Sequence, residues 1–237
     1  MSAAEWKKKC VEEWGLQGAP MPDSVDWKSV YEARPLGRNL VKNPSPHGES
    51  KDNPLPESDL EQRPMRGPPQ REPQGDFSGW TTSTEKLPQD RSGIPPGVVV
   101  CSMSQYSWFS MEQVVDLKAE GLWDELLDEF QPAIAIQDWY KDTQLQENVF
   151  ELHVKLLGAD KKTVISEHSV KPTQDRNAES PTWKEVSHMF SGYGPGVRYL
   201  SFQHRLKNMF MDGFAQGFYQ TLSSDSSVII KPTKTSS

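Results

Sequence analysis

The stretch from Phe150 to Leu156 most constrains what this chain can fold into. It reads Phe-Glu-Leu-His-Val-Lys-Leu, so apolar and polar side chains alternate along its whole length. Side chains of a β-strand point alternately to the two faces of a sheet, whereas a helix needs a repeat near 3.6 residues. The alternation therefore predicts a strand with one face on a core and one face in water.

Other short segments in the C-terminal two-thirds have the same character. Strands are expected over residues 98–106, 133–136, 162–170, 183–190, 197–202 and 227–230. The Gly/Pro-rich run 191–196 is expected to be a hairpin connection. One amphipathic helix, Leu122–Phe130, interrupts the series and ends at Pro132. Many short strands separated by turns predict a mainly β protein, either a sandwich or a barrel.

The first 37 residues predict two short helices. Ser2 and Glu5 form a capping-box pattern at the start of the first helix, and Gly15 is expected to end it. Each helix carries an apolar stripe at helical spacing, made of Trp6, Cys10 and Trp14 in the first and of Trp27, Val30 and Tyr31 in the second. Neither helix is long enough to be stable alone. We therefore expect them to pack against each other or against another domain.

Residues 44–74 differ sharply from the rest of the chain. Eight of the 19 prolines lie here among polar residues, with Leu55 and Leu60 as almost the only aliphatic side chains. Such a segment buries too little apolar surface to offset its ordering entropy, so we expect a disordered or polyproline-like insertion. It is interpreted as a linker, and the alternative is a docking segment around 63–71 for a partner with an aromatic groove.

Composition and charge exclude several classes of protein. The formal net charge is −7, which argues against a nucleic-acid binder because such proteins need a basic face. No signal peptide and no apolar run of about 18–20 residues is present, so no integral membrane segment is expected. Cys10 and Cys101 are interpreted as reduced, buried thiols, which fits a cytoplasmic location, with peripheral attachment to the plasma membrane as the open alternative.

No motif for catalysis or cofactor binding is present in the sequence. A nucleophile elbow, a P-loop, a dinucleotide fingerprint and zinc-type cysteine spacing are all missing. Four of the five histidines lie on expected strands or, for His204, just after one, but their spacing is not that of metal ligands. We therefore expect a non-catalytic binding protein with no cofactor and no metal.

Several motifs, in one order along the chain, resemble the F-box-associated (FBA) domain of the sugar-recognising F-box proteins. The longest is the run 113–128, which reads QVVDLKAEGLWDELLD. The others are 132–134 with 138–140, 193–199, 202–204 and 225–228, preceded by 38–44, which is similar to the family's first strand. The helical region 1–37 is similar to the linker that follows the F-box. The resemblance assigns 38–232 to the FBA-type domain, with 44–74 as an insertion and 233–237 as a tail.

The resemblance implies a sandwich of roughly ten antiparallel strands, jelly-roll-like, with one or two small helices. Characterised members bind the inner chitobiose of high-mannose N-glycans and mark misfolded glycoproteins for ubiquitin-dependent, ER-associated degradation. An F-box is not seen in this chain, so docking on the ligase adaptor Skp1 is not expected. In this respect the chain is similar to the F-box-less member of the group, a receptor of nonspecific cytotoxic cells.

The family's sugar-binding residues carry over to two places in this sequence. The aromatic residue before the run 113–128 matches Tyr106. A Tyr-Trp-Lys cluster matches Phe214, Ala215 and Gln216, so this chain lacks the tryptophan and the lysine of that cluster. Phe214, like the following Phe218, has the alternative role of anchoring its loop in the core. These four matched positions are the candidate glycan-binding residues.

Two functions follow as expectations. The first is recognition of a glycoprotein, or of another protein ligand, through the loops around Tyr106 and Phe214. The second, left open as an alternative, is innate-immune recognition and signalling through protein–protein contacts, with the Pro-rich segment recruiting partners.

Overall fold

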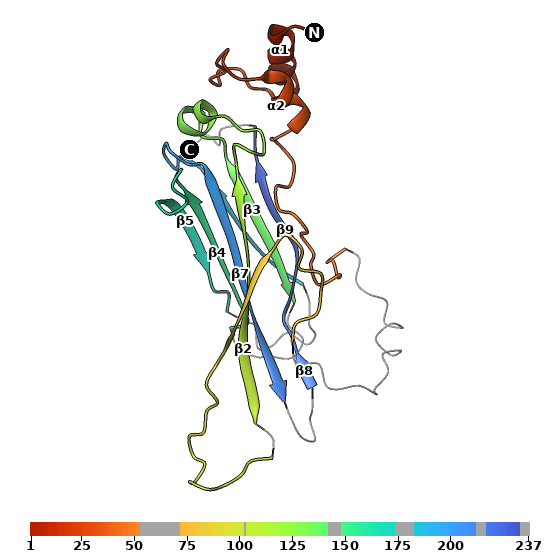
Figure 1. The fold of residues 1–237 in the computed structure, drawn as a ribbon, viewed down its shortest axis with the longest axis vertical. Helices are drawn as coiled ribbons and strands as arrows, with labels where there is room; N and C mark the ends of the chain where they lie inside the picture. The colour runs from red at the N-terminus through yellow and green to blue at the C-terminus, as the bar shows by residue number, and fades with distance from the viewer. Residues whose placement is uncertain (53–71, 102, 142–147, 174–182, 212–216, 233–237) are drawn as a thin grey trace.

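The computed structural model describes residues 1–52, 72–101, 103–141, 148–173, 183–211 and 217–232. Nine antiparallel strands of this part of the chain form the two sheets of a sandwich, which confirms the expected fold class (Figure 1). The larger sheet has the order β1-β2-β7-β4-β5, with β8 paired to β7, and the smaller sheet has the order β6-β3-β9. The strands are β1 (Thr81–Lys86), β2 (Ser104–Asp116), β3 (Ile134–Lys141), β4 (Phe150–Leu157), β5 (Val164–Val170), β6 (Lys184–Phe190), β7 (Tyr199–Met211), β8 (Gly217–Tyr219) and β9 (Leu222–Ile230).

The core lies between the sheets and follows the alternation in the sequence. In β4 the apolar members of the alternating run, Phe150, Leu152, Val154 and Leu156, are all fully buried. The ring of Phe150 stacks on Tyr140 of the smaller sheet with centroids 4.5 Å apart. Period-two burial on both sheets therefore closes one continuous core, as expected for a sandwich.

The connection after β6 differs from the expected hairpin. β6 belongs to the smaller sheet and β7 to the larger one, so residues 191–198 cross between sheets and the hairpin prediction was wrong. Asp128 fixes this crossing, because its carboxylate accepts hydrogen bonds from Arg198 at 2.8 and 2.7 Å and from the Gly196 amide at 2.8 Å. Arg198 holds the pKa of Asp128 below its usual range despite partial burial. Asp128 itself lies on a π-helix, η1 (Leu126–Phe130), within the expected helical segment.

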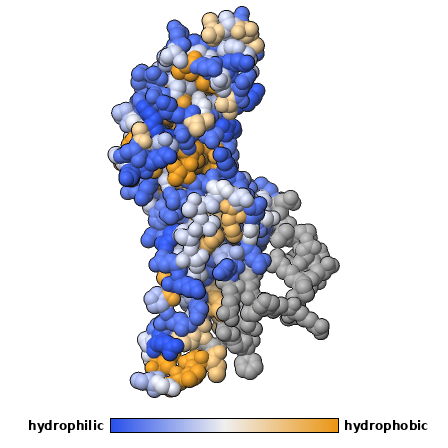
Figure 2. All heavy atoms as spheres, viewed as in Figure 1, coloured by the Kyte–Doolittle hydropathy of each residue, from blue (hydrophilic) through white to orange (hydrophobic). Residues whose placement is uncertain are grey.

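The strand expected to start at Val98 begins only at Ser104. The preceding loop, 87–101, lies at the end of the molecule farthest from the helices, where Figure 2 shows a gathering of apolar surface (Figures 1 and 2). Val98, Val99 and Val100 in this loop are 48%, 87% and 40% exposed. Their β-branched side chains fit a strand, but no strand among the described residues pairs with them, so their preference for a strand is not realised.

The N-terminal helices, α1 (Ala3–Trp14) and α2 (Trp27–Ala33), form as expected. Ser2 caps α1 in a capping box with Glu5, and Gly15 ends the helix in a left-handed conformation. Trp27 of α2 lies edge-on to Trp123 with ring centroids 4.9 Å apart, and the indole of Trp123 donates a hydrogen bond to the Pro20 carbonyl at 2.7 Å. The helices are therefore packed on one end of the sandwich (Figure 1).

Residues 37–44, which include the expected first strand, run along the open edge of β9 instead of forming a regular strand. Only one isolated bridge, Asn39 to Ile229, is formed, but the Leu40 amide also donates to the Val228 carbonyl at 2.8 Å. The Asn39 side chain donates to the Ser226 carbonyl at 2.9 Å and accepts from the Val228 amide at 3.1 Å. This segment covers an edge that would otherwise expose unpaired backbone groups.

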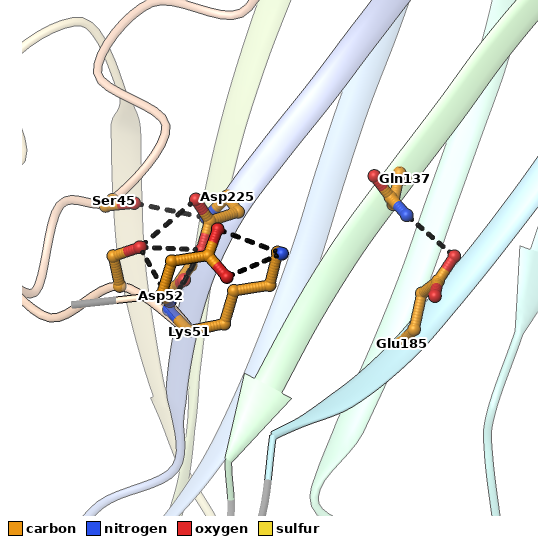
Figure 3. Close-up of polar contacts among 8 residues, drawn as sticks. Ser45, Lys51, Asp52, Gln137, Glu185 and Asp225 are labelled. Atoms are coloured by element: carbon orange, nitrogen blue, oxygen red, sulfur yellow. Dashed lines mark hydrogen bonds and ion pairs between the residues drawn. The ribbon is translucent and has the colours of Figure 1, made fainter. Parts of the chain in front are cut away.

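The next residues, 45–52, continue along β9 and are here called the strap. Asp225, which lies at an irregularity of β9 with φ of 52°, accepts hydrogen bonds from the Ser50 hydroxyl at 3.2 Å and the Lys51 amide at 3.1 Å (Figure 3). The Asp225 amide donates to the Ser45 hydroxyl at 3.1 Å. The expectation of an unpacked segment over 44–74 therefore does not hold for the strap, while 53–71 lies outside the described residues.

The two cysteines lie in different environments. Cys10 is buried, as expected, and burial together with the nearby Glu13 raises the pKa of its thiol to about 11. Cys101 is exposed in the loop before β2, so the expectation of burial was wrong for this residue. Among the helices of the described residues, none has the length and apolar character needed to cross a membrane.

Candidate functional site

The candidate site lies at the end of the larger sheet that is farthest from the helices. Here the first residues of β2, the last residues of β7 and the short β8 lie side by side (Figure 1). Tyr106 of β2 pairs with Met209 of β7, and Met209 pairs with Tyr219 of β8. Directly opposed residues of antiparallel strands point to the same face, so these three side chains form one row across three strands.

A second row on the same face brings a lysine to the aromatic rings. Trp108 pairs with Lys207, one alternation further along each strand. The Lys207 ammonium lies 5.1 Å from the ring centroid of Tyr106 and 5.8 Å from that of Trp108. Such cation–π contacts are worth about 0.5–1 kcal/mol at exposed sites. We call Tyr106, Trp108, Lys207, Met209 and Tyr219 the aromatic platform.

Arg205 borders the platform and has its charge neutralised. Its guanidinium lies 4.9 Å from the Trp108 ring centroid and forms ion pairs with Glu85 at 2.9 Å and Glu151 at 3.1 Å. Burial alone would raise the pKa of Glu151, but the His153 hydrogen bond and the charges of Arg205 and Lys171 outweigh it and lower the pKa. Glu151 is thus held as a carboxylate beside the platform.

Only one of the four sequence-predicted site residues can be placed. Tyr106 is 37% exposed, in the first row of the platform. Phe214, Ala215 and Gln216 lie outside the described residues, which resume at Gly217. Phe218 pairs with Phe210, so it points to the face opposite Tyr106 and Tyr219.

The structure adds residues that the sequence reasoning did not single out. Trp108 could have been found, because it follows Tyr106 at the period-two spacing of a strand. Lys207 and Met209 could not, since they lie about a hundred residues away and only the β2–β7 register brings them to Tyr106. Tyr219 directly follows Phe218, but its place beside Met209 depends on strand pairing.

Three buried polar side chains between the sheets are arranged like the Asp-His-Ser catalytic triad of a hydrolase. Asp138 Oδ2 lies 2.6 Å from His204 Nδ1, and Ser223 Oγ lies 3.4 Å from His204 Nε2. All three residues are fully buried, and Trp80 stacks on the imidazole with centroids 5.0 Å apart. A catalytic serine must meet its substrate, so this arrangement is structural and joins β3, β7 and β9.

The other histidines do not make a metal site in the part of the chain that is described. His168 of β5 and His188 of β6 stack with ring centroids 3.9 Å apart, but no third ligand joins them. No group of three or more His, Cys, Asp or Glu side chains suited to a metal occurs among the described residues.

The fold and the platform together define a class: an antiparallel β-sandwich with an aromatic surface at one end of its larger sheet. The family model for the F-box associated region matches residues 31–230. The chain therefore belongs to the F-box-associated (FBA) family, which confirms the resemblance found in the motifs.

Similar proteins cover nearly the whole chain. It is 56% identical to F-box only protein 50 of Danio rerio, covering 99% of both chains. It is 40% identical to F-box only protein 50 of Homo sapiens, covering 97% of this chain and 76% of that protein. It is 33% identical to F-box only protein 2 of Bos taurus, covering 96% of this chain and 70% of that protein.

Proposed function

We propose that this protein is a non-catalytic recognition protein that binds glycoproteins through the aromatic platform. The observation that carries the proposal is the row of Tyr106, Met209 and Tyr219 with Lys207 against the Tyr106 ring. Sugar sites need aromatic rings that stack on pyranose C–H faces and a few polar groups held on rigid elements. Both are supplied here by paired strands.

The platform also offers substitutes for two missing family residues. The family's tryptophan and lysine are replaced in this chain by Ala215 and Gln216. Trp108 and Lys207 bring one indole and one ammonium to the Tyr106 ring from the strands. We infer that this pair takes over the stacking and charge that the loop lacks.

The polypeptide part of a glycoprotein has a surface available at the same end of the molecule. The loop before β2 exposes Val98, Val99 and Val100, and it leads directly into the strand that carries Tyr106. Exposed apolar surface of this kind suits contact with an unfolded chain. The proposal therefore extends to misfolded glycoproteins delivered to ubiquitin-dependent degradation.

The test is equilibrium binding of the full chain to a high-mannose glycoprotein, with its enzymatically deglycosylated form as control. We expect binding that disappears on deglycosylation and is weakened at least about fivefold by Tyr106→Ala, since a lost stacking contact costs ~1 kcal/mol or more. Tyr199→Ala is the matched control: Tyr199 lies at the other end of β7 with Lys161 4.8 Å from its ring centroid. Equal binding of the two glycoprotein forms would refute the proposal.

The link to degradation needs a separate test. Purified chain and Skp1 are mixed and analysed by size-exclusion chromatography with light scattering. We expect no complex, so delivery would depend on another partner. Co-elution of the two proteins would instead show that this chain has its own docking surface for the adaptor.

A further inference from the structure

Lys207 differs from the neighbouring cations of the larger sheet in its partners. Arg205 and Lys171 both form ion pairs with Glu151, at 3.1 and 3.4 Å. Within the described residues, no carboxylate lies within ion-pair distance of Lys207, and its ammonium lies against the rings of Tyr106 and Trp108. The platform therefore holds one cation that is paired only with aromatic faces.

The position of this ammonium bears on which sugars can stack. A neutral pyranose that stacks on the Tyr106 ring competes for the face that Lys207 covers. The displaced Lys207 ammonium would lose its contact with the Tyr106 ring and gain no charged partner. This loss offsets part of the favourable energy of stacking the sugar on the ring. A sugar that carries an anionic group can accept a charge-assisted hydrogen bond from the displaced Lys207 ammonium.

We propose that Lys207 makes the aromatic platform select sugars bearing an anionic group, such as a phosphate on a mannose residue; this inference rests on the proposed function. The nearby carboxylates do not oppose it, because Glu85 and Glu151 are paired with the two cations Arg205 and Lys171. The anion would thus meet a cation that no carboxylate of the described residues pairs with, beside a border of balanced charge, on the face that also stacks the ring.

The experiment compares two free high-mannose oligosaccharides with an intact chitobiose, identical except for a 6-phosphate on mannose. Binding to the full chain is measured by titration calorimetry. We expect the phosphorylated form to bind at least about fivefold more tightly, which corresponds to ~1 kcal/mol. Lys207→Gln should remove this preference, so that the two forms bind with equal affinity. Lys161→Gln, which removes the matching lysine over Tyr199, should retain the preference.

The outcomes separate the two proposals. Equal affinity for both oligosaccharides, with no change in Lys207→Gln, overturns anion selection and leaves glycan recognition standing. Binding of neither oligosaccharide overturns the proposed function and this inference with it. Inorganic phosphate at the same concentration should not displace the phosphorylated sugar, and displacement would show a simple anion site in place of a sugar site.

Discussion

His204 Nδ1 lies 2.6 Å from Asp138 Oδ2, and both side chains are completely buried between the two sheets. Asp138 is further held by the Ser226 hydroxyl at 2.8 Å and by the Trp139 amide at 3.0 Å. The pair joins β7 of the larger sheet to β3 of the smaller one. Loss of the Asp138 carboxylate would leave the buried His204 Nδ1 and the Ser226 hydroxyl without this partner.

Asp138→Ala should therefore lower the free energy of unfolding by about 3–5 kcal/mol, the usual cost of removing one partner of a buried pair. Urea denaturation followed by tryptophan fluorescence measures this value. Gln137→Ala is the control, because Gln137 lies on the outer side of the same strand and its side chain bonds to the exposed Glu185 at 2.6 Å (Figure 3). A loss below about 1 kcal/mol in Asp138→Ala would contradict a structural role for the pair.

The stacked His168–His188 pair should make the sandwich less stable in acid. Burial lowers the pKa of both imidazoles, and repulsion between the two rings lowers that of His168 further. Their inward-facing neighbours on β4 and β6 include Val154 and Phe190, which are apolar. In the unfolded chain each imidazole has a pKa of about 6.5. The contribution of the neutral pair to the free energy of unfolding is therefore fully present above that pH and is lost as the pH falls below it.

His188→Gln should reduce the loss of thermal stability between about pH 7.5 and 5.5, because the remaining imidazole no longer faces a second one. A residual loss is expected from His47, since burial lowers its pKa to about 4. His153→Gln serves as the control, because His153 lies beside the Glu151 carboxylate at 2.9 Å. If His188→Gln and the unmodified protein lose equal stability in acid, the stacked pair has no part in it.

Gly121 should tolerate no side chain where the helices meet the sandwich. Its φ is 109°, and an added Cβ would lie 2.9 Å from the Cβ of Ala33 and 3.4 Å from that of Pro35. Gly93 has a φ of 80° but open space around it, so it isolates the effect of conformation alone. We expect Gly121→Ala to unfold at lower urea than Gly93→Ala, with an additional loss of about 1–3 kcal/mol from overpacking. Equal losses would mean that the helices move aside freely.

Removal of the Asp225 carboxylate should release the strap from β9. Asp225→Gly keeps the positive φ of 52° without strain but deletes the acceptor for the Lys51 amide. Hydrogen–deuterium exchange of peptides covering 45–52 should become faster, because the amide loses its protection. Asp160→Gly removes a comparable carboxylate from the distant turn before β5 and should leave the strap unchanged. Unchanged exchange in Asp225→Gly would show that other contacts hold the strap.

The local sequence was sufficient to predict the elements whose pattern of apolar and capping residues matches the structure. The alternation in Phe150–Leu156 produced β4, and the capping residues Ser2 and Gly15 bounded α1. It was insufficient at Val98–Val100, whose strand-forming side chains have no partner strand in the described part of the chain. It was also insufficient at 191–196, where a turn-like composition forms a crossing between sheets. In both cases the outcome depended on which distant strand lay alongside.

The sequence by itself determined the class of fold, the helical N-terminus and the family, because periodicity, capping and ordered motifs are properties of neighbouring residues. Only the tertiary structure decided that Lys207 covers Tyr106 and that Asp138 meets His204. These contacts join residues that are 101 and 66 positions apart. They arise from strand register and from the burial of two sheets on one core, and neither quantity is encoded in any short stretch of the chain.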